Sequence, residues 1–572
     1  SISVTVTDVA SNPNFNSVTL YVGYYTRSGH GAVPLAASGL GVLNGLPVTS
    51  WTLTRTAGDS TAWPSTVTTG QTPAPSRALT AADNATTATY SITADGVDTG
   101  ETLTISVTGA GYTVSAKNDI ESSTTGLRAT SVKSQMGGRS VYFQRGSDDA
   151  WANAGFAGTS SGSDIAFIRA FNTHTGTITW TSADAGKKPA IGRMYIGADM
   201  VGHRFTGLRF EKALTAYPAN GLTSTTQSSR QNIELFECDR AANVRDIEID
   251  NNTFGAPDTA TDPTQWISAI NIAGSYSGSS LANNIHIHDN TFTRVRNGIS
   301  FGNITGSTFE DFTIAHFSGD AINGGASSFN TITIQDFAIS HPYTNSAASG
   351  FHPDFVQIGS TNAATSISEV IIRRGVLDTG VGNRMAQGPF FNDTGFSSVY
   401  SGNIVQYTSG ATYGDGQQRL SGFTANNCEI SNILYLGGFS NGITLDYGSG
   451  WTIRNNTLIR YSAPNAGTSS APTIRPVILR DSVTLAAITS TGTIYGNVSF
   501  ADVDTATGLT ETNNVTMTDP GSSLEAQYTY YETLFNDPRN GDWTPISGGA
   551  LSLGGGKYAG AYNPDGSWAD AT

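Results

Sequence analysis

One short phrase recurs through the middle of this chain and limits the folds open to it. Each copy holds a short strand of alternating β-branched residues, an Asn, Asp or Gly corner, and a second short strand. A unit of this kind, repeated roughly every 20 to 50 residues, is typical of a solenoid of β-coils. The sequence therefore predicts a right-handed parallel β-helix with strand ladders exposed on its faces. The clearest copies are NVRDIEIDNNTF, NNIHIHDNTFTRVRNGISF, FEDFTIAHFSGDAING, FNTITIQDFAIS, ISEVIIRRGVLD and WTIRNNTLIRY.

The composition is typical of a protein built from strands and turns, while the charge and the apolar pattern argue against nucleic-acid and membrane partners. The chain has 65 Gly, and only 13% of its residues are charged, which suits strands and turns. Its net charge is −15 and its 30 basic residues are scattered, so we expect no nucleic-acid partner. No apolar run approaches the length of a membrane span, so we expect no membrane insertion. Cys238 and Cys428 fall on coil strands, and we expect both to be free, buried thiols.

The strand pattern changes along the chain and predicts three parts. Residues 1–117 carry alternating strands joined by Gly-, Pro- and Ser-rich turns, which predicts an antiparallel β-sandwich that serves as a mounting or accessory domain. Residues 118–510 form the predicted β-helix, whose open end a cap helix from Leu127 to Met136 covers. Residues 511–572 form a C-terminal closing segment.

Several segments carry a family resemblance. SVYFQRG, TGTITWTSADAGKKPAIG, MVGHRFTGLRFEK and the NNTF corners resemble the opening coils of the pectate-lyase-like β-helix superfamily. LFNDPRNGDWTPISGGALSLGGGKYAGAYNPDGSW is similar to its closing segments. The superfamily includes polysaccharide lyases, glycoside hydrolases, phage tailspike depolymerases and adhesins. The resemblance implies a polysaccharide partner and no cofactor. A tailspike would further imply a homotrimer at the virion surface or outside the cell, joined to a phage tail or baseplate through its N-terminal domain.

Aligning the coils on their second strand produces a candidate catalytic pair. Asp320 and Asp354 fall at one position of neighbouring coils, about 4.8 Å apart at the backbone. Two carboxylates this close repel, so one would keep its proton as a general acid and the other act as base or nucleophile. Corner Asp residues also accept backbone hydrogen bonds, and that structural role stays open. The same alignment points five residues inward: Ile299, Ile322, Val356, Phe390 and Ile443.

Other residues complete the predicted site. His352 stands two residues before Asp354 in FHPDFVQI and is the third catalytic candidate. Asn323 and Gln357 stack by the same alignment and can bind sugar hydroxyls. Further candidates for substrate binding are Arg373 and Arg384, which could pair with a uronate, Asp393, and Tyr343, which could stack on a sugar ring.

The sequence leaves three functions open. We favour a tailspike-like glycoside hydrolase that cleaves a bacterial surface or extracellular polysaccharide. The second is a polysaccharide lyase, with Arg384 or His352 abstracting the proton at C5 of a uronate, and the third is a non-catalytic adhesin. We expect no metal site, because His286 and His288 share one strand face without a third ligand at a suggestive spacing.

Overall fold

The computed structural model divides the chain into two compact units, each built mainly from strands, so the predicted all-β class is confirmed. The first unit comprises Ser1–Gln144 and Thr173–Ala183, and the second Arg145–Asn172 and Asp184–Thr572. Within the described segments, no helix is long and apolar enough to cross a membrane. The structure describes residues 2–7, 42–43, 46–47, 51–58, 66–69, 87–94, 96–108, 112–114, 140–143, 165–168, 174, 176–182, 188, 190–197, 199–211, 234–238, 244–272, 281–325, 328–343, 353–359, 366–380, 386–392, 404–407, 424–437, 441–445, 448–460, 473–476, 478–481, 487–488, 491–500, 508–518 and 523–569.

A five-stranded sheet forms the main element of the first unit. Strands β4, β5, β6 and β7 pair antiparallel, as the turn-rich sequence predicts, but β1 pairs parallel to β7. The expectation of a wholly antiparallel domain is therefore wrong for β1. Many residues separate β1 from β7 along the chain, so no tight hairpin forces these two strands to run antiparallel. The strands are β1 (Ile2–Thr7), β4 (Trp51–Gly58), β5 (Thr66–Thr69), β6 (Thr87–Ala94) and β7 (Val97–Thr108). The predicted cap helix at 127–136 lies outside the described residues.

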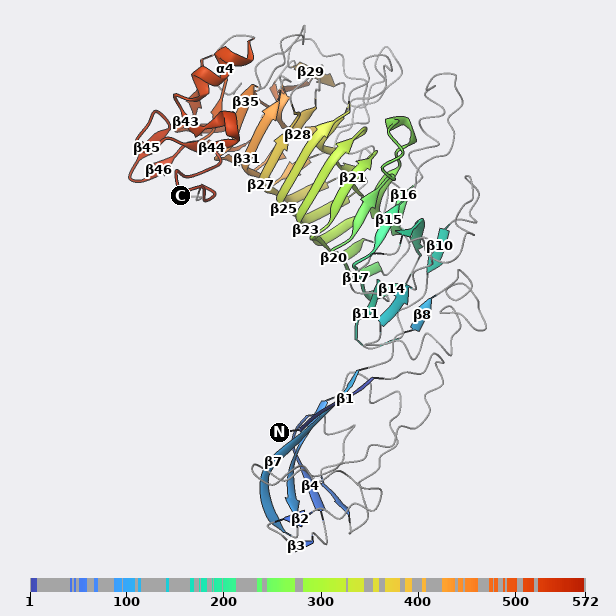
Figure 1. Cartoon of the computed structure of the whole chain (residues 1–572). Coiled ribbons are helices and arrows are strands. Elements are labelled where there is room, and N and C mark those ends of the chain that lie inside the picture. The colour runs from blue at the N-terminus through green and yellow to red at the C-terminus, as the bar shows by residue number, and fades with distance from the viewer. Residues whose placement is uncertain are drawn as a thin grey trace. The chain divides into compact units, whose positions relative to one another are not determined.

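In the second unit, parallel strands stack coil upon coil (Figure 1), the arrangement of a parallel β-helix. Each coil adds one strand to a ten-stranded sheet whose spatial order follows the order of the chain. Its strands are β10 (Ile165–Ile168), β13 (Arg193–Ile196), β16 (Glu234–Cys238), β19 (Ser268–Ile272), β22 (Ile299–Phe301), β24 (Ile322–Gly325), β26 (Asp354–Gly359), β28 (Gln387–Asn392), β32 (Asn441–Leu445) and β36 (Thr473–Pro476).

The rest of each coil belongs to a larger parallel sheet, which we call the long sheet. Its central strands are long because they continue through bends in the backbone. The strands used below are β14 (Met200–Thr206), β17 (Val244–Asp250), β18 (Thr253–Gly255), β20 (Ala282–His288), β21 (Thr291–Val295), β23 (Ile304–Phe317), β25 (Ser328–Pro342), β27 (Ser366–Asp378), β31 (Glu429–Gly437), β34 (Trp451–Arg454), β35 (Thr457–Arg460), β39 (Gly492–Tyr495), β40 (Val498–Ser499), β41 (Leu509–Thr512) and β42 (Val515–Thr516).

The predicted corners bend the long sheet. Asn251, Asp289, Asp311 and Asp336 hold equivalent positions in successive coils, with φ between 50° and 54°. Asn and Asp tolerate this left-handed conformation better than other residues with a side chain, which explains the repeating corner signal. Arg374 adopts the same conformation one coil later, and its guanidinium donates two hydrogen bonds to Asp336.

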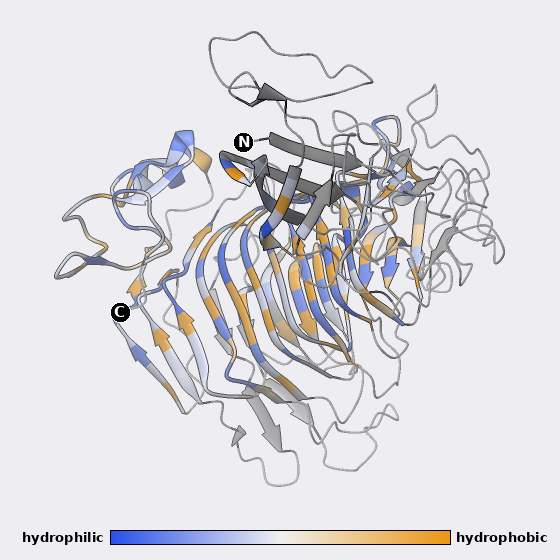
Figure 2. Ribbon diagram, turned by 90° about the horizontal axis from the view of Figure 1, so that it is seen from below, coloured by the Kyte–Doolittle hydropathy of each residue, from blue (hydrophilic) through white to orange (hydrophobic). Residues whose placement is uncertain are grey.

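Alternating strand residues fill the interior of the coils. Ile299, Ile322, Val356 and Ile443 are fully buried, which confirms their predicted inward position. Figure 2 shows the same alternation as hydrophobic and hydrophilic residues along the strands. Phe390 was predicted at this position too, and that is wrong: Pro389 pairs with Val356, and Phe390 pairs with Gln357. The sequence alone does not fix the register of β28, and a shift of one residue in register changes the face.

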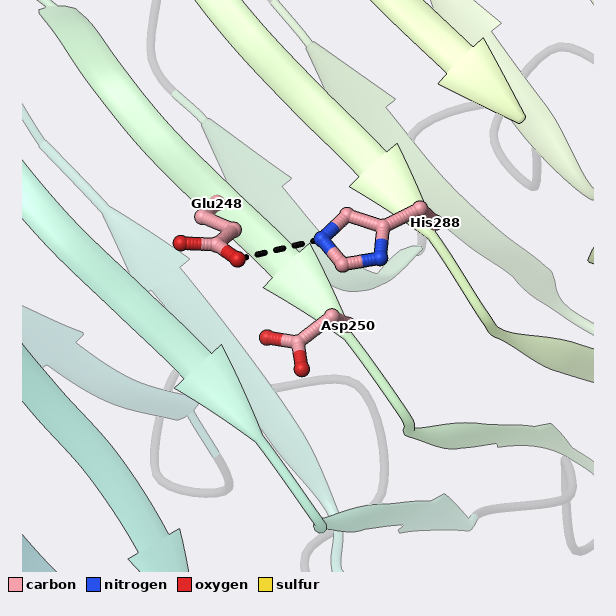
Figure 3. A group of neighbouring side chains, drawn as sticks. All are labelled: Glu248, Asp250 and His288. Carbon is pink, nitrogen blue, oxygen red and sulfur yellow. Dashed lines mark hydrogen bonds and ion pairs between the residues drawn. The ribbon is translucent and has the colours of Figure 1, made fainter. Parts of the chain in front are cut away.

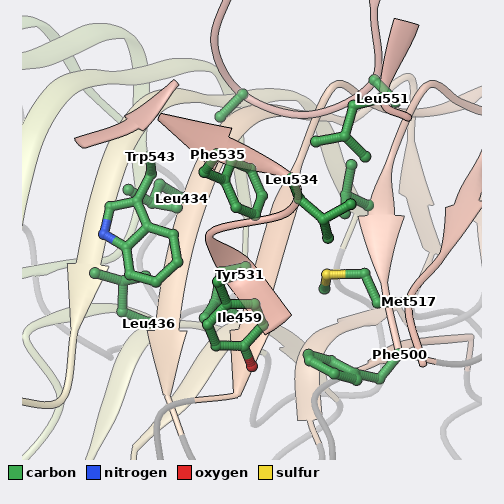
Figure 4. Packing of buried hydrophobic residues seen from close by; sticks show 13 residues of the cluster. Leu434, Leu436, Ile459, Phe500, Met517, Tyr531, Leu534, Phe535, Trp543 and Leu551 are labelled. Atoms are coloured by element: carbon green, nitrogen blue, oxygen red, sulfur yellow. The ribbon is translucent and has the colours of Figure 1, made fainter. Parts of the chain in front are cut away.

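The C-terminal segment covers the outer surface of the last coils (Figure 4). Helix α4 (Leu524–Tyr531) and the hairpin β43 (Phe535–Asp537) and β44 (Asp542–Pro545) supply its aromatic residues. Tyr531, Phe535 and Trp543 pack with Leu434 of β31 and Ile459 of β35 in one buried cluster. The hydroxyl of Tyr531 also donates a 2.8 Å hydrogen bond to the carbonyl of Arg460. This contact shields strand faces that would otherwise expose large apolar side chains.

Candidate functional site

A row of polar side chains crosses the outer face of the ten-stranded sheet. Asn271, Ser300, Asn323 and Gln357 pair in register on β19, β22, β24 and β26, and we call them the polar row. Each is partly exposed, whereas the residues before and after it point inward and are buried. The Asn323 amide donates a 3.3 Å hydrogen bond to Gln357 Oε1. Four such groups at the strand spacing extend over about 14 Å.

The predicted catalytic pair lies at the entry to the same strands. Ile322 pairs with Val356, so Asp320 and Asp354 hold equivalent positions on neighbouring coils, as the sequence alignment requires. Asp320 Oδ1 accepts the backbone N–H of Asp354 at 3.2 Å, and Asp320 Oδ2 accepts the Asn323 amide at 2.5 Å. These are the corner hydrogen bonds that the sequence left open as the structural role of Asp320.

A catalytic carboxylate must reach its substrate, but Asp354 is only 1% exposed, so its carboxylate does not line an open surface. Asn297 shows the pattern one coil earlier, because its Oδ1 accepts the backbone N–H of Asp320 at 3.1 Å. The side chains of these corner residues thus connect each strand entry to the next coil. The adjacency was predictable from the repeat, and so was the burial, because Asp354 lies two residues before the inward Val356 on the same strand.

A partly buried arginine supplies positive charge beside Asp320. Burial lowers the pKa of Arg296, while the carboxylates of Asp320 and Glu234 act in the opposite direction. Glu234 Oε1 also accepts the Asn271 amide at 3.2 Å, which links this charged group to the polar row. The site therefore combines fixed amides with an arginine flanked by carboxylates, suited to hydrogen-bonding many hydroxyl groups.

An aromatic side chain stands at the same corner. Tyr343 is 36% exposed, the highest value among the large aromatic residues that the structure describes. Its backbone N–H bonds the carbonyl of Phe317, three residues before Asp320. Its ring meets the edge of Trp266, with centroids 6.1 Å apart, two residues before β19 begins. An exposed ring supported by a second ring can stack on the apolar face of a sugar.

The structure separates Arg373 from this group. It lies on β27 of the long sheet, where its Nε donates to Gln335 Oε1 at 2.8 Å. His352, Arg384 and Asp393 lie outside the described residues. Of the predicted residues, the structure thus brings Asp320, Asp354, Asn323, Gln357 and Tyr343 to neighbouring coils of one region.

Sequence reasoning missed a second cluster, on the long sheet. Glu248 and Asp250 of β17 lie beside His288 of β20, and these three form what we call the histidine cluster. The missing partners of His288 come from the preceding coil, where IEID (247–250) aligns with IHIH (285–288). That alignment was available in the repeat, because residues at one position of two coils are spatial neighbours.

Comparison with protein-family models, with curated proteins and with solved structures gives no match for this chain.

Proposed function

We propose that this protein binds an extended polysaccharide across the outer face of the ten-stranded sheet. The observation that carries the proposal is the polar row, whose side chains repeat in register on four consecutive strands. A polymer with repeating hydroxyl groups can bond to successive rungs of such a row, so that many weak contacts act together. Tyr343 adds a stacking surface at the corner near Asp320.

Hydrolysis by Asp320 and Asp354 is the second candidate. Their equivalent positions on neighbouring strands support it, since glycosidases use two carboxyl groups close together. The burial of Asp354 and the corner hydrogen bonds of Asp320 favour binding without cleavage. The lyase alternative relies on His352 and Arg384, which lie outside the described residues.

The test is binding to purified bacterial capsular and extracellular polysaccharides, measured by affinity electrophoresis. Asn323→Ala and Gln357→Ala should each weaken binding about tenfold, the effect of losing roughly 1.4 kcal/mol of hydrogen bonding. Thr333→Ala is the matched control, because this partly exposed residue lies on β25 of the long sheet. Equal affinity for all four proteins would contradict the assignment of the polar row.

The same samples separate binding from hydrolysis. Reducing ends should not accumulate with the unmodified protein if it only binds. If they do accumulate and Asp354→Asn abolishes them without lowering the melting temperature or the affinity, the hydrolase is the correct assignment.

A further inference from the structure

The histidine cluster gathers three potential metal ligands on one face of the long sheet. Glu248 and Asp250 are two positions apart on β17, so their side chains leave the same face. Asp250 pairs in register with His288 on β20. One ligand atom from each of the three lies within 4.8 Å of the other two (Figure 3).

The histidine ring is oriented as in many metal sites. His288 Nδ1 lies 2.8 Å from Asp289 Oδ2, and Nε2 lies 3.0 Å from Glu248 Oε1. A metal-binding histidine commonly gives its other ring N–H to a carboxylate, which fixes the tautomer and the direction of the ligating nitrogen. Asp289 occupies that supporting position and is outside the ligand set. Its own place is fixed by the corner, where it adopts φ 52°.

Three hydrogen bonds fix the Asp250 carboxylate, and one of its oxygens can still accept a further bond. Arg204 Nε donates to Oδ1 at 2.9 Å, while Arg204 Nη2 and Thr206 Oγ1 donate to Oδ2 at 2.8 Å. Each carboxylate oxygen offers two lone pairs, so Oδ1 retains one for a metal ion. Arg204 positions the carboxylate, as groups behind the ligands do in metal sites.

Two of the three side chains reach solvent, and the cluster needs little rearrangement to admit an ion. The side chain of Glu248 is 35% exposed and that of His288 is 17% exposed, whereas that of Asp250 is 5% exposed. Ligands at about 2.1 Å from a tetrahedral ion lie roughly 3.4 Å apart. The distance from Glu248 to His288 is already shorter than that, and the flexible Glu248 side chain can move to admit the ion.

We propose that Glu248, Asp250 and His288 bind a divalent transition-metal ion such as Zn²⁺. One imidazole nitrogen and two carboxylates suit such an ion, whereas Ca²⁺ and Mg²⁺ prefer oxygen ligands alone. The site lies on the long sheet, so it stands independently of the polysaccharide proposal. Positions of the ion not filled by protein face solvent and take water or an oxygen of a ligand.

Two positive side chains moderate the expected affinity. Arg204 is bonded to Asp250, and Lys188 Nζ donates to the carbonyl of Asn251 at 2.6 Å. With these charges nearby and only three protein ligands, Zn²⁺ should bind more weakly than at a structural site with four ligands.

The experiment titrates the chelator-treated full chain with Zn²⁺ and measures binding by calorimetry and by metal content after dialysis. His288→Gln and Glu248→Gln should each weaken Zn²⁺ binding roughly tenfold or more. His286→Gln is the matched control, since its ring lies 4.1 Å from that of His288 while its Nε2 bonds Glu310. This control should bind Zn²⁺ like the unmodified chain, and Ca²⁺ should not compete.

Three results would overturn the proposal. They are no Zn²⁺ uptake by the unmodified chain, uptake that His288→Gln leaves unchanged, and equal loss in His286→Gln and His288→Gln. If His288→Gln lowers the melting temperature, Glu248→Gln decides instead, because the half-exposed Glu248 side chain can change without loss of core packing.

Discussion

Asparagine side chains buried at the corners should contribute strongly to stability, and Asn497 tests this most directly. It is fully buried between Asn456 and Asn514 of the neighbouring coils. Its Oδ1 accepts the backbone N–H of Asn456 at 3.0 Å and the side-chain amide of Asn456 at 2.9 Å. Its own amide donates to Ile453 O and to Asn514 Oδ1, both at 3.0 Å.

Asn497→Leu keeps the branched shape of the side chain and removes all four of these hydrogen bonds. The Asn456 N–H then loses its acceptor inside the protein, which costs about 2 kcal/mol, and the other three bonds contribute about 1 kcal/mol each. Burying the more apolar leucine offsets roughly 1 kcal/mol. We therefore expect the free energy of unfolding to fall by about 4 kcal/mol.

The assay is unfolding in guanidinium chloride, followed by tryptophan fluorescence. Trp451 is a suitable reporter, because its strand β34 pairs with β39, which ends two residues before Asn497. Asn540→Leu is the control, since this exposed asparagine bonds only Asp537 among the interactions described for its side chain. It should change stability by less than about 0.5 kcal/mol. A loss for Asn497→Leu no larger than that of the control would refute the reasoning.

Three further predictions concern packing, thiol chemistry and pH. A methyl group at Gly319 would collide with Asn297 Oδ1, so Gly319→Ala should lower the free energy of unfolding by about 1 to 3 kcal/mol, measured by the same titration. Burial raises the pKa of the Cys428 thiol to about 12, so a thiol reagent at neutral pH should label it only after unfolding, and equal rates in both states would contradict this. Burial acts to raise the pKa of Glu310, but hydrogen bonds from Gln335 and His286 outweigh it and lower that pKa in the folded state. The stability from Glu310 is therefore present above the ordinary carboxyl pKa and lost as pH falls through the lowered value, so Glu310→Gln should flatten the acid side of a plot of melting temperature against pH.

The repeat by itself determined the class of fold and much of the register. Alternation along each strand assigned Ile299, Ile322 and Val356 to the interior, because successive side chains of a strand point to opposite faces. Asn and Asp corners marked the bends, since few other residues tolerate the left-handed conformation. Equal positions in two coils also placed Asp320 beside Asp354.

Only the tertiary structure decided which of these neighbouring side chains are exposed and which groups they contact. Alternation from the inward Val356 already places Asp354 on the buried side and Gln357 on the outer side, but the sequence could not show that Asp320, at the same position of the neighbouring coil, stays partly exposed. It misassigned Phe390, since the sequence does not fix the register of β28 and a shift of one residue in register changes the face. It left His288 without partners, because Glu248 and Asp250 are 40 and 38 residues away along the chain. The register of β17 against β20 brings all three together. Residues at one position of successive coils are one strand spacing apart in space, although a whole coil separates them along the chain.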